Sequence, residues 1–152
     1  MTRIIASVFL PALLLMCVAC LSPVTLHPPA GYAVMEPDGS YRAVSPEGMP
    51  LRIRSFENTP EKSLDFWSEA LRNHLQKEGY RPIGSMQEFQ AGDIPGASFE
   101  WAVPYGSDDY VYLTALLVTG KRIYLAEAAA PYPLYEQYRA KLKESLLTIR
   151  PR

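Results

Sequence analysis

Three consecutive stretches in the second half of the chain carry the pattern of β-strands, and they restrict the fold more than any other feature. In residues 97–103 (ASFEWAV) large apolar side chains recur at every second position, which indicates a strand with two unlike faces. Residues 110–119 (YVYLTALLVT) are the most strand-like run, and residues 122–130 follow after a tight turn. Strands joined by short turns pair antiparallel, so a meander is predicted, with 110–119 near its centre. Pro95 and Gly96, just before the meander, are expected in a loop.

Shorter strands are expected before this meander. Residues 31–35, 41–45 and 49–56 are separated by two turns that contain Pro and Gly, and the third stretch alternates apolar and basic side chains. Residues 80–89 are ambiguous, because Pro82 cannot donate a ladder hydrogen bond and permits an edge strand at most.

A helix is predicted over residues 60–78. Thr59 suits its N-cap, Pro60 its first position and Gly79 its left-handed C-terminal end. Between these ends, apolar residues recur at helical spacing and form one stripe: Leu64, Trp67, Leu71 and Leu75. His74 borders the stripe, and we expect it at the edge of the core and not in a metal or catalytic site.

A second amphipathic helix is predicted near the C-terminus. Its stripe has spacings of three and four residues: Tyr135, Tyr138, Leu142, Leu146 and Ile149. Pro131 and Pro133 end the preceding strand, and Pro151 blocks further helix. The order of strands, helix, meander and helix predicts one α+β domain over residues 31–150, an antiparallel β-sheet with two amphipathic helices packed on it.

The first 20 residues are expected to direct export and not to fold with this domain. Arg3 precedes the apolar residues 4–16, which have the length of a signal-peptide core and are too short to span a bilayer. The sequence VAC that ends at Cys20 resembles the cleavage site of bacterial lipoproteins. This resemblance implies a signal peptide over residues 1–19 and a diacylglyceryl group on Cys20. An ordinary cleaved leader is the alternative.

The distribution of cysteine agrees with such a leader. Cys17 and Cys20 are the two cysteines of the chain, so the residues after Cys20 contain no disulfide, thiol nucleophile or Cys-ligated metal. Residues 20–30 comprise this lipid-anchor cysteine and a Pro-rich stretch, which is expected to form a tether. By analogy with lipoprotein sorting, Leu21 after the cysteine, in place of Asp, favours the outer membrane in a cell with two membranes.

The order of elements resembles the PsbP-like α/β/α sandwich family, which includes many bacterial envelope lipoproteins. The resemblance covers roughly residues 31–150 and rests on four stretches: the SPEG turn, the LRIR strand after it, the helix start TPEKSLDFW and the helix after PYPLY. It implies an accessory or binding module without enzyme activity. A cystatin-like α+β roll has the same order of elements and is the alternative.

The sequence contains no recognisable catalytic motif. Neither a GxSxG nucleophile turn nor a phosphate-binding loop occurs, and the two histidines, His27 and His74, lie far apart. Asp108 and Asp109 are expected in a solvated turn, and Glu127 is expected to face solvent, with a buried position as the alternative. We therefore expect no enzyme activity, metal or cofactor. The formal net charge of −1 gives no electrostatic case for nucleic-acid binding.

Tyrosine is the remaining candidate for function, because the 10 tyrosines cannot all be core residues. Four of them form a candidate binding surface: Tyr105, Tyr132, Tyr135 and Tyr138. Packing between sheet and helix is the alternative for these side chains. Two functions stay open. The first is a lipid-anchored envelope protein that binds another protein. The second is a periplasmic small-molecule binder with a pocket between sheet and helix, lined by Trp67, Trp101 and tyrosines.

Overall fold

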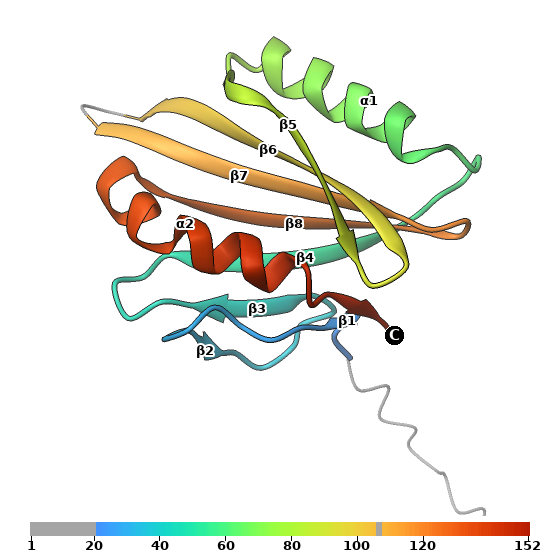
Figure 1. The fold of residues 1–152 in the computed structure, drawn as a ribbon, viewed down its shortest axis with the longest axis horizontal. Coiled ribbons are helices and arrows are strands. Elements are labelled where there is room, and N and C mark those ends of the chain that lie inside the picture. Colours follow the sequence, from blue (N-terminus) through green and yellow to red (C-terminus); the bar gives the residue numbers. More distant parts are fainter. Residues whose placement is uncertain (1–20, 106–107) are drawn as a thin grey trace, which may run out of the picture.

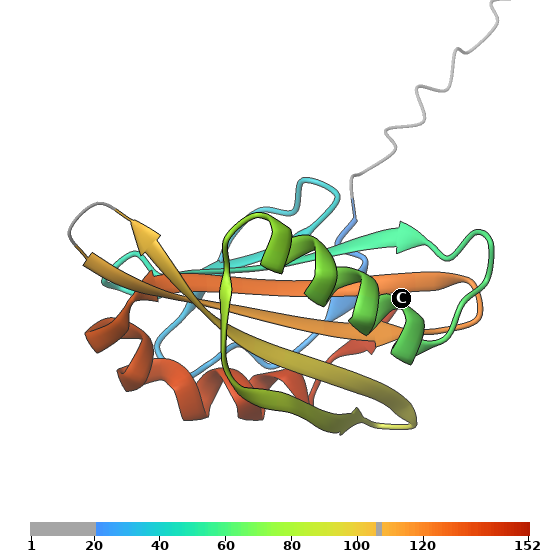
Figure 2. The same cartoon turned by 90° about the horizontal axis from the view of Figure 1, so that it is seen from above.

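A seven-stranded antiparallel sheet forms the middle layer of the protein, with one helix on each face (Figure 1 and Figure 2). The computed structural model describes residues 21–105 and 108–152. Across the sheet, the strands are β2 (Ala33–Val34), β3 (Tyr41–Val44), β4 (Pro50–Glu57), β8 (Arg122–Pro131), β7 (Asp108–Val118), β6 (Ile94–Tyr105) and β5 (Arg81–Ala91). The predicted α+β class and the predicted meander are both confirmed.

The alternation of side chains in β7 decides which residues each helix covers. Leu113 and Leu117 belong to the core cluster that contains the buried side chains of α2 (Tyr132–Leu146). Tyr112, which directly precedes Leu113, packs on a smaller cluster beneath α1 (Leu64–Lys77). Successive side chains of a strand point to opposite faces, so the two helices cover opposite faces of one sheet.

Helix α1 begins later than the sequence predicts. Its N-cap is Ser63, whose Oγ accepts a backbone hydrogen bond of 3.3 Å in the first turn, so Thr59 and Pro60 lie before the helix. The buried Asn58 accounts for the difference. Its side chain accepts a hydrogen bond from the Lys62 N–H at 3.0 Å and donates one to the Lys62 carbonyl at 3.0 Å, which holds the intervening residues in a turn.

The other helix ends follow from local chemistry. Gly79 has a φ of +89° and ends α1, and the Tyr80 N–H donates to the Leu75 carbonyl at 3.0 Å, as in a Schellman motif. Helix α2 begins at Tyr132, before the predicted stripe, because Pro133 occupies its first turn, where a missing N–H costs no hydrogen bond.

Strand β5 is an outer strand, as the ambiguous segment allowed, and a two-residue turn at Gly92 and Asp93 joins it to β6. The expectation of a loop at Pro95 and Gly96 is wrong, because both residues lie inside β6. The ring of Phe89 covers Gly96 so closely that a Cβ there would lie 2.5 Å from the ring. Glycine at this strand position therefore makes room for a cross-strand aromatic side chain.

The segment expected to be a tether is packed on the domain. Strand β1 (Val24–Thr25) pairs with β9 (Arg150–Pro151), and Val24 is only 1% exposed. The His27 N–H donates to Thr148 Oγ1 at 2.9 Å. Apolar burial and this pairing hold the segment in place despite its prolines. Cys20 and the leader lie outside the described residues. Within the described part of the chain, no helix has the length and apolar character needed to cross a membrane.

Candidate functional site

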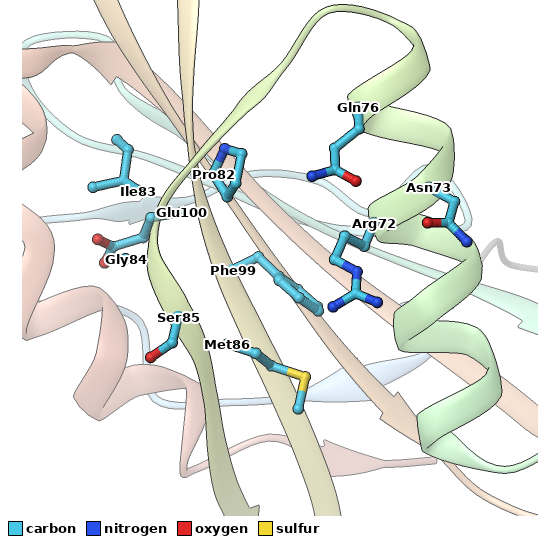
Figure 3. Close-up of a pocket in the computed structure, with 10 residues that line it drawn as sticks. All are labelled: Arg72, Asn73, Gln76, Pro82, Ile83, Gly84, Ser85, Met86, Phe99 and Glu100. Carbon is cyan, nitrogen blue, oxygen red and sulfur yellow. The ribbon is translucent and has the colours of Figure 1, made fainter.

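An open groove of about 520 Å³ lies between helix α1 and the outer strand β5 (Figure 3). Helix α1 contributes three polar side chains to it: Arg72, Asn73 and Gln76. Strand β5 contributes five consecutive residues, and β6 forms the floor. These residues are Pro82, Ile83, Gly84, Ser85 and Met86 of β5, with Phe99 and Glu100 of β6.

A bulge in β5 shapes this groove. Ile83 pairs with Glu100 and Gln87 pairs with Ser98, so the three residues between Ile83 and Gln87 lie opposite Phe99 alone. The extra residues bend a bulged strand away from its neighbour. Gly84 begins the bulge with a φ of +70°, which residues with a side chain rarely adopt.

The groove contains polar side chains that have no hydrogen-bond partner in the part of the chain that the structure describes. Arg72, Asn73 and Gln76 are exposed, and their side chains make no hydrogen bond or ion pair with any residue in 21–105 or 108–152. Figure 3 shows Arg72 and Gln76 reaching from α1 toward β5. Beside them Ile83 and Met86 are each 38% exposed. The groove therefore offers one cation, two amides and apolar surface to a ligand.

Glu100 lies under the bulge and is only 8% exposed. It accepts hydrogen bonds from the Tyr135 hydroxyl at 3.0 Å and from Arg139 Nε at 3.0 Å, and Lys143 Nζ lies at 2.8 Å. Burial alone would raise the pKa of the Glu100 carboxyl, but the bonds from Arg139, Lys143 and Tyr135 outweigh it and lower that pKa. Arg139 and Lys143 therefore balance the negative charge of the Glu100 carboxylate, which has a structural role. Its pKa is not raised, as the pKa of a general acid would be.

A second groove, of about 250 Å³, opens beside the same bulge. Ile83, Gly84, Ser85 and Glu100 line both grooves, and Arg139 and Lys143 of α2 complete the second one. The bulge thus shapes the surface on both sides of β5. The sequence gives no clear local signal for this region, because a lone glycine such as Gly84 does not predict how many residues of one strand will lie opposite a single residue of the next.

The four candidate tyrosines do not form one exposed surface. Tyr135 and Tyr138 are 1% and 7% exposed, and their hydroxyls donate to Glu100 and to Glu47 at 3.0 and 2.8 Å. They are buried because they lie on the stripe of α2 that faces the sheet. Tyr132 is 52% exposed at the start of α2. The side chain of Tyr105 lies outside the described part of the chain.

The other candidate polar residues are dispersed. His74 is exposed on α1 and not at the edge of the core, and Asp109 is exposed at the start of β7. The Asp108 side chain is outside the description. Glu127 is partly buried, accepting a hydrogen bond from the Tyr112 hydroxyl at 2.5 Å and forming an ion pair with Arg54 at 2.7 Å. No three His, Cys, Asp or Glu side chains of the described residues lie together as a metal site would require.

The two tryptophans do not line an open cavity. Trp101 is fully buried, stacks on Phe99 with ring centroids 5.5 Å apart, and donates from Nε1 to Thr114 Oγ1 at 3.0 Å. Trp67 donates from Nε1 to Asn58 Oδ1 at 2.8 Å. Both indoles therefore make their contacts within the protein, and neither lines the grooves described above.

Comparison with known proteins identifies the fold and leaves the function open. No protein-family model matches the chain, and no curated protein sequence matches it. Among solved structures, a protein of unknown function from Pseudomonas aeruginosa has a TM-score of 0.61 at 6% identity, over 80% of this chain and 97% of that one. LpqN, which is involved in cell envelope biogenesis of Mycobacterium tuberculosis, has a TM-score of 0.61 at 13% identity, over 84% of this chain and 83% of its own.

The third comparison bears on the predicted family of folds. Cyanobacterial PsbP (CyanoP) from Synechocystis has a TM-score of 0.56 at 7% identity, and the match covers 87% of this chain and 94% of CyanoP. At such low sequence identity the similarity shows the fold alone. The chain therefore has a PsbP-like fold, with two helices packed on an antiparallel sheet.

Proposed function

We propose that this chain is a lipid-anchored envelope protein whose folded domain binds a segment of another protein and catalyses no reaction. The leader that ends at Cys20 supports the anchor. The structural similarity to LpqN, a protein of cell envelope biogenesis, supports the compartment. Leu21 after the cysteine favours the outer membrane if the cell has two.

The observation that carries the binding role is the open groove between α1 and β5. Arg72, Asn73 and Gln76 face it, and their side chains have no hydrogen-bond or ion-pair partner among the described residues. Amide side chains can both donate hydrogen bonds to a peptide backbone and accept them, and a guanidinium binds carboxylates. The exposed Met86 and the floor at Phe99 offer apolar contact to a side chain of the same peptide.

These features favour a short extended peptide over a long added strand. Pro82 has no N–H, and the bulge interrupts the edge of β5, so this edge offers no continuous ladder of hydrogen bonds. An acidic residue in the peptide would pair with Arg72. Glu100 does not take this role, because it already pairs with Arg139 and Lys143. A small apolar ligand is less suited, because such ligands bind in enclosed pockets and this groove is open.

The anchor is tested by the intact mass of the protein extracted from membranes of its host. We expect a chain that begins at Cys20 and carries acyl chains, and a Cys20→Ala variant that lacks this modification. A soluble mature chain of unmodified mass would exclude the anchor but would leave the peptide-binding role to be tested separately.

The binding role is tested with a photo-crosslinking residue introduced at position 72 or 86 in host cells. We expect adducts with a protein at both positions, and none at position 77, where Lys77 is exposed on α1 outside the groove. Because arginines at the centre of an interface often dominate binding, Arg72→Ala should weaken the adduct formed at position 86 by roughly tenfold. Lys77→Ala should not change it. Equal adducts at all three positions would contradict the proposed site.

A further inference from the structure

Three exposed apolar side chains gather where the described chain begins. Leu21, Val34 and Met35 are 66%, 57% and 42% exposed, and all three line one shallow groove of about 300 Å³. We name them the N-terminal patch. Strand β2, which carries Val34, is the last strand of its sheet, and among the described residues no strand pairs with its free edge.

The patch includes Leu21, the residue that directly follows Cys20 in the sequence. Val24 is already buried and paired with β9. An extended chain spans at most about 3.6 Å per residue, so the step from Cys20 to Val24 covers no more than about 14 Å. A lipid on Cys20 would therefore bring the patch to the membrane surface.

We propose that the N-terminal patch docks on the bilayer that holds the lipid of Cys20; this inference rests on the lipid anchor proposed above. Leu21, Val34 and Met35 enter the boundary between headgroups and acyl chains, where exposed apolar side chains are stabilised. Arg42 and Arg152 line the same groove and lie at the level of the headgroup phosphates. Asp38 pairs with Arg42 at 3.2 Å, so apolar contact contributes more than charge does.

Docking in this way orients the whole domain. Strands β2 and β5 are the two outer strands of the sheet, and Figure 1 shows the start of β5, beside α1, on the side away from β2. The other end of β5 reaches the β1–β9 ribbon, where Gly92 lies beside Arg150. The groove lies at the α1 end of β5, where residues 82–86 line it. The groove beside β5 would then face away from the bilayer and stay open to a partner protein.

The test uses the full lipidated protein in phosphatidylcholine vesicles that contain doxyl-labelled lipid as a quencher. No cysteine follows Cys20, so a fluorophore can be attached at Val34→Cys or Met35→Cys, with Gln76→Cys in the opposite groove as the matched control. We expect blue-shifted emission and several-fold stronger quenching at positions 34 and 35 than at 76. Val34→Asp should reduce the quenching of a label at position 35.

The outcomes separate this inference from the proposed anchor. Absence of quenching at all three positions, with acylated protein still bound to the vesicles, would overturn the docking and leave the anchor intact. A blue shift at position 34 without quenching would mean that another protein surface, such as a second copy, covers the patch, which also overturns the inference. Protein of unmodified mass that stays out of the vesicles would overturn the anchor and the docking together.

Discussion

The outer strand β5 runs for 11 residues, whereas β2, at the opposite edge of the same sheet, has only two. The β5 edge mixes polar and apolar side chains, and its bulge opens grooves toward both helices. The β2 edge is short and apolar, and it lies beside the β1–β9 ribbon at the start of the described chain. A long exposed edge invites unwanted pairing, which Pro82 and the bulge oppose, while a very short edge offers little to pair with.

The two edges also differ in how they are held. At the β2 edge, Val24 is buried by apolar packing and strand pairing. Near the β5 edge, the buried Glu100 joins the sheet to α2 through Arg139, Lys143 and Tyr135. One edge therefore depends on apolar burial and the other on a buried ionic network, and the two should respond differently to mutation and to pH.

The largest effect is expected from Val24→Asp. This change places an unpaired charge in the core beside the β1–β9 pair, and it should lower the free energy of unfolding by at least about 3 kcal/mol. Leu21→Asp is the matched control, because Leu21 is 66% exposed, and it should change stability by less than about 0.5 kcal/mol. Urea unfolding followed by tryptophan fluorescence measures both. Equally small effects would mean that the first residues do not belong to the cooperative fold.

A smaller effect is expected from Glu100→Gln, which removes the charge that Arg139 and Lys143 share. Loss of one partner costs about 3–5 kcal/mol in a fully buried pair, and we expect about 2–3 kcal/mol here. The discount applies because the Arg139 and Lys143 side chains stay 40% and 39% exposed. Glu136→Gln is the control, since this exposed partner of Arg139 should contribute below about 1 kcal/mol. The same unfolding measurement applies. Equal losses of unfolding free energy in the two variants would contradict a stabilising role of the Glu100 network.

The free energy of unfolding should depend on pH in part through the ionisation of Glu100. Its pKa in the folded protein is lowered, so its contribution is fully present above the usual carboxyl pKa of 4.5 and is lost as the pH falls through the lower folded value. Wild type should therefore lose stability on acidification below about pH 5, and Glu100→Gln should lose less over the same range.

Two carboxyls near the β2 edge contribute to the acid response of both proteins. Asp38 has a lowered pKa, chiefly because Ser40 donates a hydrogen bond to it, and Glu47 has one chiefly because Tyr138 does. The informative quantity is thus the difference between wild type and variant, measured by urea unfolding at a series of pH values. Parallel stability curves would argue against a charged Glu100 in the folded state.

The smallest stability effect is expected from alanine at two glycines, one near each edge. Gly84 in β5 and Gly39 before β3 have φ values of +70° and +86°, and an added Cβ meets nothing within 4 Å at either. Each Gly→Ala change should cost about 1 kcal/mol of backbone strain. Only Gly84→Ala should also weaken crosslinking from position 86, because only Gly84 shapes the groove. Equal crosslinking in both variants would show that the shape of the bulge does not matter for binding.

Much of the architecture could be predicted from local patterns. The alternation in residues 97–103 placed Phe99 and Trp101 on one face, and both are buried beneath α1. Gly79 marked the end of α1 correctly. The start of α1 was misplaced, because Thr59 and Pro60 suit a helix start and only the bonds of Asn58 to Lys62 hold them outside it.

The candidate site was less accessible to prediction. Tyrosine was chosen because it suits contact surfaces, yet Tyr135 and Tyr138 use their rings for the core and their hydroxyls for Glu100 and Glu47. Whether a tyrosine on an amphipathic stripe is core or surface depends on what packs against that stripe. Arg72 and Met86 gave no local signal, because the groove that they line forms only where α1 lies beside the bulged strand β5.

By itself, the sequence determined the order of strands and helices, the faces of the strands and the helix stripes, because these depend on period and on neighbours in the chain. Tertiary structure alone decided that a Pro-rich segment packs as β1 against β9, that β5 bulges opposite Phe99, and that Glu100 is neutralised by α2. Each of these outcomes joins residues distant in sequence, and its free energy depends on burial and pairing that exist only in the folded chain.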